Sequence, residues 1–259
     1  MTLAEIRQLV KDSAGGCGLP ERELLLALSS DARTGVREIY TRLERQRRLF
    51  LKEAERLDDL LLYENRLAAG GIEAVAGVDE AGRGPLAGPV LAAAVILPPG
   101  ARINEINDSK RLSPDKREAL ALQIKKISRA WAVGMSTVEE ILRLNIYRAS
   151  MLAMRRALEA LDTVPGHVLV DGFAIPDLGL PQTPIVGGDG KSASIAAASI
   201  LAKVTRDDLM DRIHLRYPQY GFDRHRGYAT PDHIQALRLH GPCPIHRQGF
   251  RPVKMSSKK

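Results

Sequence analysis

Beyond Gly70-Gly71 the sequence alternates short apolar runs with segments that begin at helix-capping residues, and this alternation limits the fold more than any other feature. The apolar runs suit core strands; they lie at residues 74–78, 90–97, 130–136, 167–170 and 183–186. Strands and helices that alternate in this way are typical of an α/β fold, in which helices cover a sheet.

Four helices are predicted in the same part of the chain. Ser113-Pro114 is a good N-cap and first-turn pair for a helix to about residue 127, and Thr137 with Glu140 forms a capping box for a helix to residue 161. A helix rich in small residues begins near Ser192, and Thr230-Pro231 begins the last one. The small residues of the helix near Ser192 allow it to pack closely on a sheet.

The first seventy residues have a different, all-helical pattern. A capping box at Thr2 and Glu5 begins a short helix that the glycines at 15–18 end, and a second short helix follows at 21–28. Residues 34–69 form one long predicted helix, with apolar residues repeated every seven positions from Val36 to Leu57. We therefore expect two domains, 1–70 and 71–259, divided at Gly70-Gly71.

Charge is distributed unevenly between these two parts. Residues 1–70 carry 12 basic and 12 acidic side chains, whereas residues 71–259 carry 26 and 19, so the net charge of +7 lies entirely in the second part. A basic surface favours a polyanion such as nucleic acid. The long N-terminal helix has a basic face at Arg45, Arg48, Lys52 and Arg56, interleaved with acids, which is either a solvated face or an auxiliary nucleic-acid contact.

Several classes of protein are excluded. Cys17 and Cys243 are far apart, which excludes a CxxC motif and disfavours a disulfide framework. The histidines at 214, 225, 233, 240 and 246 have no recognised zinc spacing. Without a signal region or a membrane-length apolar stretch, we expect a cytoplasmic protein that does not contact membranes.

Carboxylates follow three of the predicted strands. Asp79 and Glu80 stand together in the run from Gly77 to Pro85, and Asp171 and Asp189 each end a later apolar run. Neighbouring side chains on a strand alternate between faces, so the first two serve one centre only if the strand ends there. Oxygen ligands of this kind suit Mg²⁺. An acidic pair before a turn can also be merely solvated, so these residues alone leave both interpretations open.

Basic residues near these carboxylates are candidates for phosphate contacts. Lys110 lies in a polar loop after the second strand. Lys203 and Arg206 could contact phosphate or form ion pairs with acids such as Asp207. The C-terminal segment, which includes Arg247, has no acid after Asp232 and is expected to add nonspecific attraction.

Long ordered motifs make the chain resemble a known family. They are VLVDG at 168–172, VGGD at 186–189, SASIAAASILAKVTRD at 192–207, and a tail from Tyr217 to Val253 that contains GYATPDH and HRQGFRPV. With the run at 77–85 they resemble bacterial ribonuclease HII over residues 72–253. Residues 1–70 resemble, more loosely, the helical N-terminal extension of some Gram-positive members.

The resemblance implies a ribonuclease H-like mixed sheet flanked by helices, preceded by a small all-helical module for auxiliary substrate binding or docking. It implies an endonuclease that hydrolyses the RNA strand of RNA:DNA hybrids and cuts 5′ of ribonucleotides embedded in duplex DNA. Two Mg²⁺ or Mn²⁺ ions would take part, leaving 5′-phosphate and 3′-hydroxyl ends. We expect a monomer.

The same resemblance implies roles for individual residues. Asp79 would bridge the metal ions, Glu80 and Asp171 would bind metal and orient water and the scissile phosphate, and Asp189 would complete the site. Gly82, Arg83, Gly84 and Tyr228 would recognise the junction between a ribonucleotide and DNA, and Lys110 would lie near the active site. On their own, the glycines could form an ordinary tight turn and Tyr228 could be a packed ring with an exposed hydroxyl.

Two other classes of protein fit the same sequence, and the chain differs from the family pattern in one segment. The alternatives are ribonuclease HIII, which shares the fold but generally lacks the Gly82-Arg83-Gly84 loop (the GRG loop), and a catalytically silent hybrid-binding protein. The departure concerns Gly187, where the family commonly has lysine, and Lys191, in a region usually richer in small residues. These changes could relocate a phosphate contact.

Overall fold

The structure is a computed structural model that describes residues 1–13 and 22–256. The chain divides into two compact units, residues 1–59 and 60–259. Each unit has its own buried apolar cluster, so we describe them separately.

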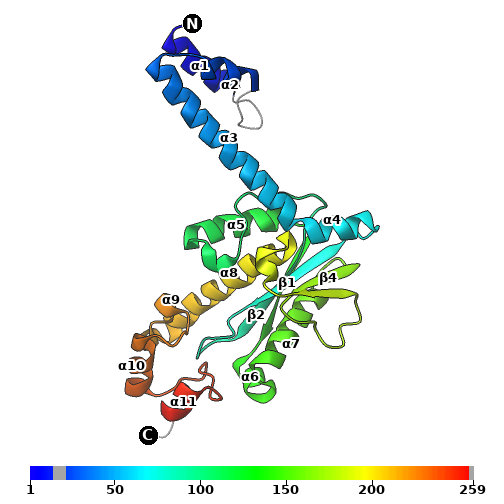
Figure 1. The fold of residues 1–259 in the computed structure, drawn as a ribbon. Coiled ribbons are helices and arrows are strands. Elements are labelled where there is room, and N and C mark those ends of the chain that lie inside the picture. Colours follow the sequence, from blue (N-terminus) through cyan, green and yellow to red (C-terminus); the bar gives the residue numbers. More distant parts are fainter. Residues whose placement is uncertain (14–21, 257–259) are drawn as a thin grey trace. The chain divides into compact units, whose positions relative to one another are not determined.

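The N-terminal unit consists of α1 (Leu3–Ser13), α2 (Arg22–Ser29) and most of α3 (Thr34–Leu60) (Figure 1). The predicted capping box is confirmed: Thr2 N donates to Glu5 Oε2 at 2.7 Å, and Glu5 N donates to Thr2 Oγ1 at 3.3 Å. The glycines at 15–18 lie outside the described residues. The three helices bury one shared cluster, made of Ile6, Val10, Leu25, Leu28, Val36, Ile39 and Leu43.

The prediction of one helix over residues 34–69 is wrong. α3 ends at Leu60, and α4 (Leu62–Ala69) belongs to the C-terminal unit. The break is at Leu61, whose backbone (φ −90°, ψ 4°) leaves the helical region while its side chain stays buried. Leucine is a good helix former, so the apolar pattern alone gave no indication of a turn.

The C-terminal unit is built on a mixed sheet of five strands in the order β3-β2-β1-β4-β5. The strands lie close to the predicted runs: β1 (Val75–Ala81), β2 (Val90–Ile96), β3 (Ala130–Ser136), β4 (His167–Asp171) and β5 (Gln182–Ile185). β1 pairs antiparallel with β2 and parallel with β4. The parallel pair brings the carboxyl ends of β1 and β4 to the same edge of the sheet.

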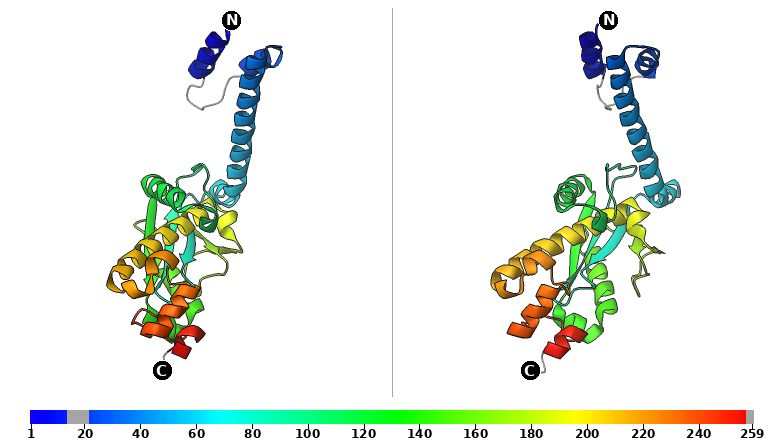
Figure 2. Two further views of the ribbon diagram at one scale, coloured as in Figure 1. Left: turned by 90° about the vertical axis from the view of Figure 1, so that its left-hand side faces the viewer. Right: turned by 60° about the vertical axis from the view of Figure 1, so that its left-hand side comes forward.

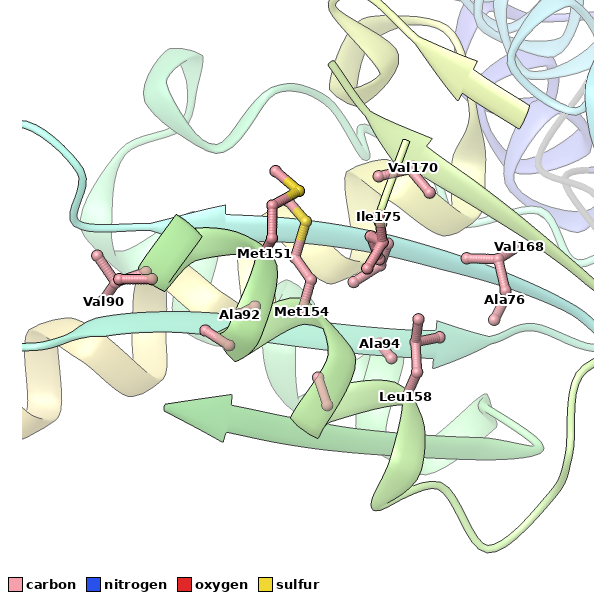
Figure 3. Packing of buried hydrophobic residues seen from close by; sticks show 14 of the residues in the cluster. Ala76, Val90, Ala92, Ala94, Met151, Met154, Leu158, Val168, Val170 and Ile175 are labelled. Carbon is pink, nitrogen blue, oxygen red and sulfur yellow. The ribbon is translucent and has the colours of Figure 1, made fainter. Parts of the chain in front are cut away.

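Helices cover both faces of this sheet (Figures 1 and 2). α8 (Ala193–Arg216) packs on β1 and β2, with α5 (Pro114–Ile127) beside it, and α7 (Ile146–Glu159) packs on β2 and β3 from the other side. Figure 3 shows Met151, Met154 and Leu158 of α7 lying over the alanines of β2. Glycine permits the closest approach: a Cβ on Gly77 would stand 2.1 Å from the Ser194 carbonyl carbon of α8.

The predicted helix from Thr137 to Leu161 is divided in two, which corrects that expectation. The capping box between Thr137 and Glu140 is present and begins α6 (Val138–Leu144). Asn145 then adopts φ 67° and its side chain accepts a hydrogen bond from Arg148 N, which starts α7. Asn tolerates positive φ better than most residues and is a strong N-cap, so it ends one helix and begins the next.

The remaining helices follow α8 and gather at one end of the unit, coloured orange to red in Figure 2. They are α9 (Phe222–His225), α10 (Pro231–His240) and α11 (Arg251–Ser256), with the short 3₁₀ helix η3 (Pro218–Tyr220) before α9. Two other short 3₁₀ helices, η1 (Ser109–Arg111) and η2 (Gly188–Gly190), precede α8 in the chain. The predicted helix starts at Ser113, Ser192 and Thr230 are confirmed. No helix in the described part of the chain has the length and apolar character needed to span a membrane.

Candidate active site

The carboxylates of β1 lie at the edge where β1 and β4 end. Val78 of β1 is paired with Val170 of β4, so Asp79 and Asp171 are the next residues on adjacent parallel strands. Asp79 is only 4% exposed, and its Oδ1 accepts the Glu80 backbone N–H at 2.7 Å. Both β1 carboxylates line one cavity, because the strand ends one residue later at Ala81.

Asp189 is brought to the same edge by a short 3₁₀ turn rather than by a strand. The N–H of Gly188 donates to Asp171 Oδ1 at 2.6 Å, which ties η2 to the end of β4. Gly187, just before this turn, has φ 65° and ψ 41°. Glycine adopts this left-handed conformation freely, whereas lysine would be strained there. The departure at Gly187 therefore suits this turn, and the Lys191 ammonium donates to the Val186 carbonyl.

Burial and mutual repulsion make ionisation of these carboxyl groups unfavourable. Burial raises the pKa of Asp79 well above its usual range, and the charges of Glu80 and Asp171 raise it further, although the Ser199 hydroxyl partly offsets both. Burial likewise raises the pKa of Glu80 and of Asp189. Carboxylates that share a buried site in this way need a nearby cation to stay ionised together.

Two basic side chains supply part of that positive charge. Lys110 Nζ lies 3.4 Å from Asp189 Oδ2 and 3.6 Å from Asp108 Oδ1. Although partial burial opposes its ionised form, these carboxylates raise the pKa of Lys110. Arg83 Nη1 lies 3.3 Å from Glu80 Oε1. The site therefore contains carboxylates and basic side chains close to one another.

The predicted substrate residues border the same cavity of about 240 Å³. Its lining includes Asp79, Glu80, Gly82, Arg83, Gly84, Lys110, Asp171, Lys203, Arg206 and Tyr228. Tyr228 is 44% exposed, and its ring is close to Gly84, where an added Cβ would stand 3.5 Å from Tyr228 Cε1. Of the predicted site residues only Asp189 is not in the lining, and it contacts Lys110. Segments far apart in sequence thus meet at one place.

No set of three or more His, Cys, Asp or Glu side chains within residues 1–13 and 22–256 is already arranged to hold a metal ion. The donor set nevertheless suits a hard divalent cation, since Asp79, Glu80 and Asp171 offer only carboxylate oxygens. The buried histidines instead bond to one another and to backbone: His233 Nε2 lies 3.0 Å from His246 Nε2, and Cys243 N donates to His246 Nδ1.

Two arginines have positions that differ from expectation. Arg247 was expected to add nonspecific surface attraction, but it is 1% exposed and bonds only to backbone carbonyls. Arg206 is equally buried and forms no ion pair among the described residues. Lys203 pairs with Asp207 at 2.8 Å, one of the alternatives considered above. Local charge patterns predict solvent exposure for arginine, so the burial of Arg206 and Arg247 became evident only from the tertiary structure.

A five-stranded mixed sheet flanked by helices, with carboxylates at the shared end of β1 and β4, defines a ribonuclease H-like fold. A solved structure supports this assignment: ribonuclease H2 from Pyrococcus horikoshii OT3 matches with a TM-score of 0.60 and 25% identity, covering 71% of this chain and 97% of that one. Bst-RNase HIII in complex with Mn²⁺ matches with a TM-score of 0.54 and 18% identity, covering 75% and 74%, and supports the fold alone.

Family models identify the group within this fold. Residues 76–253 match the model of ribonuclease HII, and residues 2–68 match that of the ribonuclease HII N-terminal domain. Ribonuclease HII of Pelotomaculum thermopropionicum is 58% identical over 256 residues, covering 98% of this chain and 95% of that protein. The chain belongs to the ribonuclease HII family. It is therefore an endonucleolytic hydrolase of the ribonuclease H class, whose members act on RNA:DNA substrates.

Proposed function

We propose that this enzyme cuts duplex DNA on the 5′ side of an embedded ribonucleotide, as well as the RNA strand of RNA:DNA hybrids. Hydrolysis would use two divalent ions, Mg²⁺ or Mn²⁺, and leave 5′-phosphate and 3′-hydroxyl ends. The observation that carries the proposal is the shared cavity that joins Asp79, Glu80 and Asp171 to the GRG loop and Tyr228.

The carboxylates are the proposed ligands. When bound, divalent ions supply an activated water and neutralise charge on the phosphate. Asp79, placed between Glu80 and Asp171, suits the bridging position. Glu80 and Asp171 would hold metal and orient water and phosphate, and Asp189 would complete the set. The raised pKa values of Asp79, Glu80 and Asp189 support this assignment, because a bound cation would offset the cost of their ionisation.

The GRG loop is the proposed reader of the ribonucleotide. A protein distinguishes RNA from DNA through the 2′-hydroxyl. Gly82, Arg83 and Gly84 present a backbone without bulky side chains on either side of Arg83, and the half-exposed Tyr228 ring stands beside Gly84. Lys110 is a proposed phosphate contact, since its side chain is 76% exposed and its ammonium lies next to Asp189.

We further propose that the N-terminal extension, predicted as residues 1–70, acts as an auxiliary module for substrate binding or docking, and that the rest of the chain is the catalytic domain. The structure moves the division between them from residue 70 to residue 59, because α4 packs within the C-terminal unit. The exposed Arg45, Arg48 and Lys52 on α3 support a contact with the nucleic-acid backbone. Such a contact would add affinity without sequence information and would weaken as salt concentration rises.

Mapping the cut at single-nucleotide resolution tests the proposal. Purified protein is incubated with a labelled DNA duplex that contains one ribonucleotide, with Mg²⁺, with Mn²⁺ and with chelator. A metal-dependent cut immediately 5′ of the ribonucleotide is the expected result. Cleavage of a continuous hybrid without this cut would contradict the junction activity, and binding without any cut would favour a silent hybrid-binding protein.

A further inference from the structure

Arg247 uses its whole guanidinium to hold the loop that carries the GRG sequence. Its Nε donates to Gly88 O at 2.8 Å, its Nη1 to Arg83 O and Pro85 O at 2.9 and 2.8 Å, and its Nη2 to Gly82 O and Pro89 O at 2.6 and 3.2 Å. A guanidinium has five N–H donors, so each has a carbonyl acceptor. These acceptors all belong to residues 82–89.

Arg206 of α8 supports the same loop from a second direction. Its Nε donates to Pro89 O and its Nη2 to Ala87 O, both at 3.2 Å, while its Nη1 donates to Arg226 O at 3.1 Å. Gly82 makes this packing possible: with φ 98°, it leaves space where a Cβ would stand 2.1 Å from Arg206 Nε. Within the described part of the chain, neither guanidinium has a carboxylate partner.

Uncompensated burial of two adjacent cations is costly. Burial, together with the neighbouring Arg206 charge, lowers the pKa of Arg247 to about 9. Burial also lowers the pKa of Arg206. An aliphatic residue at either position would avoid this cost but would leave the loop carbonyls without donors. Burying the two guanidiniums therefore costs folding free energy, and what the buried arginines provide in return is a set of hydrogen-bond donors for the loop carbonyls.

The carbonyl directions determine where the loop amides point. In a trans peptide unit the C=O of one residue and the N–H of the next point in opposite directions. Because Arg247 holds the carbonyls of Gly82 and Arg83, the N–H groups of Arg83 and Gly84 point away from it. No described group accepts a hydrogen bond from these two amides. Consecutive outward N–H groups form a concave anion-binding backbone.

We propose that Arg247, supported by Arg206, is a positioning residue that sets substrate selectivity by fixing the outward direction of the Arg83 and Gly84 amides. The inference rests on the proposed function, because those amides are the proposed contacts of the ribonucleotide. A substrate phosphate bound at these amides would also bring negative charge close to the two buried guanidiniums.

Selectivity follows from the number of productive registers. A register here is an alignment of the substrate that places a 2′-hydroxyl at the GRG loop. A continuous RNA:DNA hybrid offers a 2′-hydroxyl at every position of the RNA strand, so many registers remain productive when the loop is less ordered. A duplex with one ribonucleotide offers a single register. Loss of loop order therefore penalises the single-ribonucleotide substrate more than the hybrid.

Arg247→Lys is the discriminating variant, because lysine keeps the charge but has three donors for five carbonyls. Arg238→Lys, at an exposed position, is the matched control. We would measure kcat/KM on both substrates and hydrogen exchange at Leu86 and Gly88, whose amides donate to Gly227 O and Ile245 O. We expect Arg247→Lys to lower kcat/KM on the single-ribonucleotide duplex about 100-fold and on the hybrid about tenfold, with faster exchange at both amides.

An unchanged ratio of the two kcat/KM values, or unchanged exchange, would overturn the proposal. If Arg247→Lys does not fold, Arg206→Lys, which affects fewer loop carbonyls, must show a smaller change of the same sign, and a wild-type ratio in that variant would equally overturn it. Failure of the wild-type enzyme to cut at the single ribonucleotide would instead refute the proposed function, whereas loop exchange in the variants would still report on positioning.

Discussion

Glu64 of α4 caps the first turn of α8 through Ser194: its Oε1 accepts from Ser194 N at 2.9 Å and from Ser194 Oγ at 2.7 Å. Ser192 Oγ donates to the same oxygen at 2.6 Å. Tyr63 and Leu67 of α4 also pack on the cluster of Val75, Leu169, Ile185 and Ile195. Although α4 continues the N-terminal helical pattern, it is an integral part of the unit that holds the proposed catalytic carboxylates.

Truncation should distinguish α4 from the helices before it. Removal of residues 1–59 is expected to leave the C-terminal unit folded, with weaker and less salt-dependent substrate binding. Removal of residues 1–69 also deletes the Glu64 cap and the Tyr63 and Leu67 packing, and should cost about 3 kcal/mol or more of unfolding free energy. Urea unfolding of both proteins measures the difference. Equal stability of the two truncated proteins would show that α4 contributes nothing to this unit.

Glu64→Ala isolates the cap within the full chain. We expect a loss of about 2 kcal/mol, since the substitution leaves the Ser194 N–H and both serine hydroxyls without their carboxylate acceptor. Asn65→Ala, an exposed neighbour on α4, is the control and should change stability by less than about 0.5 kcal/mol. Similar midpoints for the two variants would contradict the capping role.

The contact between α8 and β1 depends on the absence of a side chain at Gly77. Gly77→Ala places a methyl group 2.1 Å from the Ser194 carbonyl carbon and should destabilise the protein by about 3 kcal/mol, because two backbones must separate. Gly249→Ala is the matched control, since its Cβ would meet only Leu142 Cδ1 at 3.6 Å. Thermal melting compares them, and a wild-type melting temperature for Gly77→Ala would refute the close contact.

The buried histidines predict acid sensitivity. Burial lowers the pKa of His246 to about 4 from its ordinary 6.5, so the unfolded chain binds a proton at higher pH than the folded one. The stabilisation is therefore complete above pH 6.5 and is lost as pH falls toward 4, by about 3 kcal/mol. His246→Gln should flatten this pH dependence of unfolding free energy, whereas His240→Gln, at an exposed position, should not. A wild-type slope in His246→Gln would disprove the assignment.

Much of the fold follows from local sequence because the relevant signals are local. Capping at Ser113 and Thr137 and the apolar runs predicted elements that the structure confirms. The breaks at Leu61 and Asn145 were missed. Leu61 is itself a good helix former, and the break at Asn145 consists of a single residue with positive φ inside an apolar pattern. Neither leaves a periodic signal.

The site was predictable to a similar extent. Carboxylates that follow apolar runs predicted which side chains the parallel strands β1 and β4 bring together, and the lining of one cavity now includes Asp79 and Asp171. The buried role of Arg247 was not predictable, because its acceptors lie about 160 residues earlier in the chain, at 82–89. A long-range contact between a basic side chain and backbone carbonyls has no local pattern.

The central claim, that carboxylates from β1, β4 and η2 form one divalent-metal site, is tested most directly by metal-dependent thermal stability. Wild-type protein, Asp79→Asn and the exposed control Asp232→Asn are melted in chelator and in increasing Mg²⁺ or Mn²⁺, and cleavage is assayed in parallel. A ligand at about 100 times its Kd stabilises the folded state by about 2.7 kcal/mol. We predict a saturable rise in melting temperature for wild type and Asp232→Asn, and neither rise nor cleavage for Asp79→Asn; a wild-type rise with wild-type cleavage in Asp79→Asn would contradict the account.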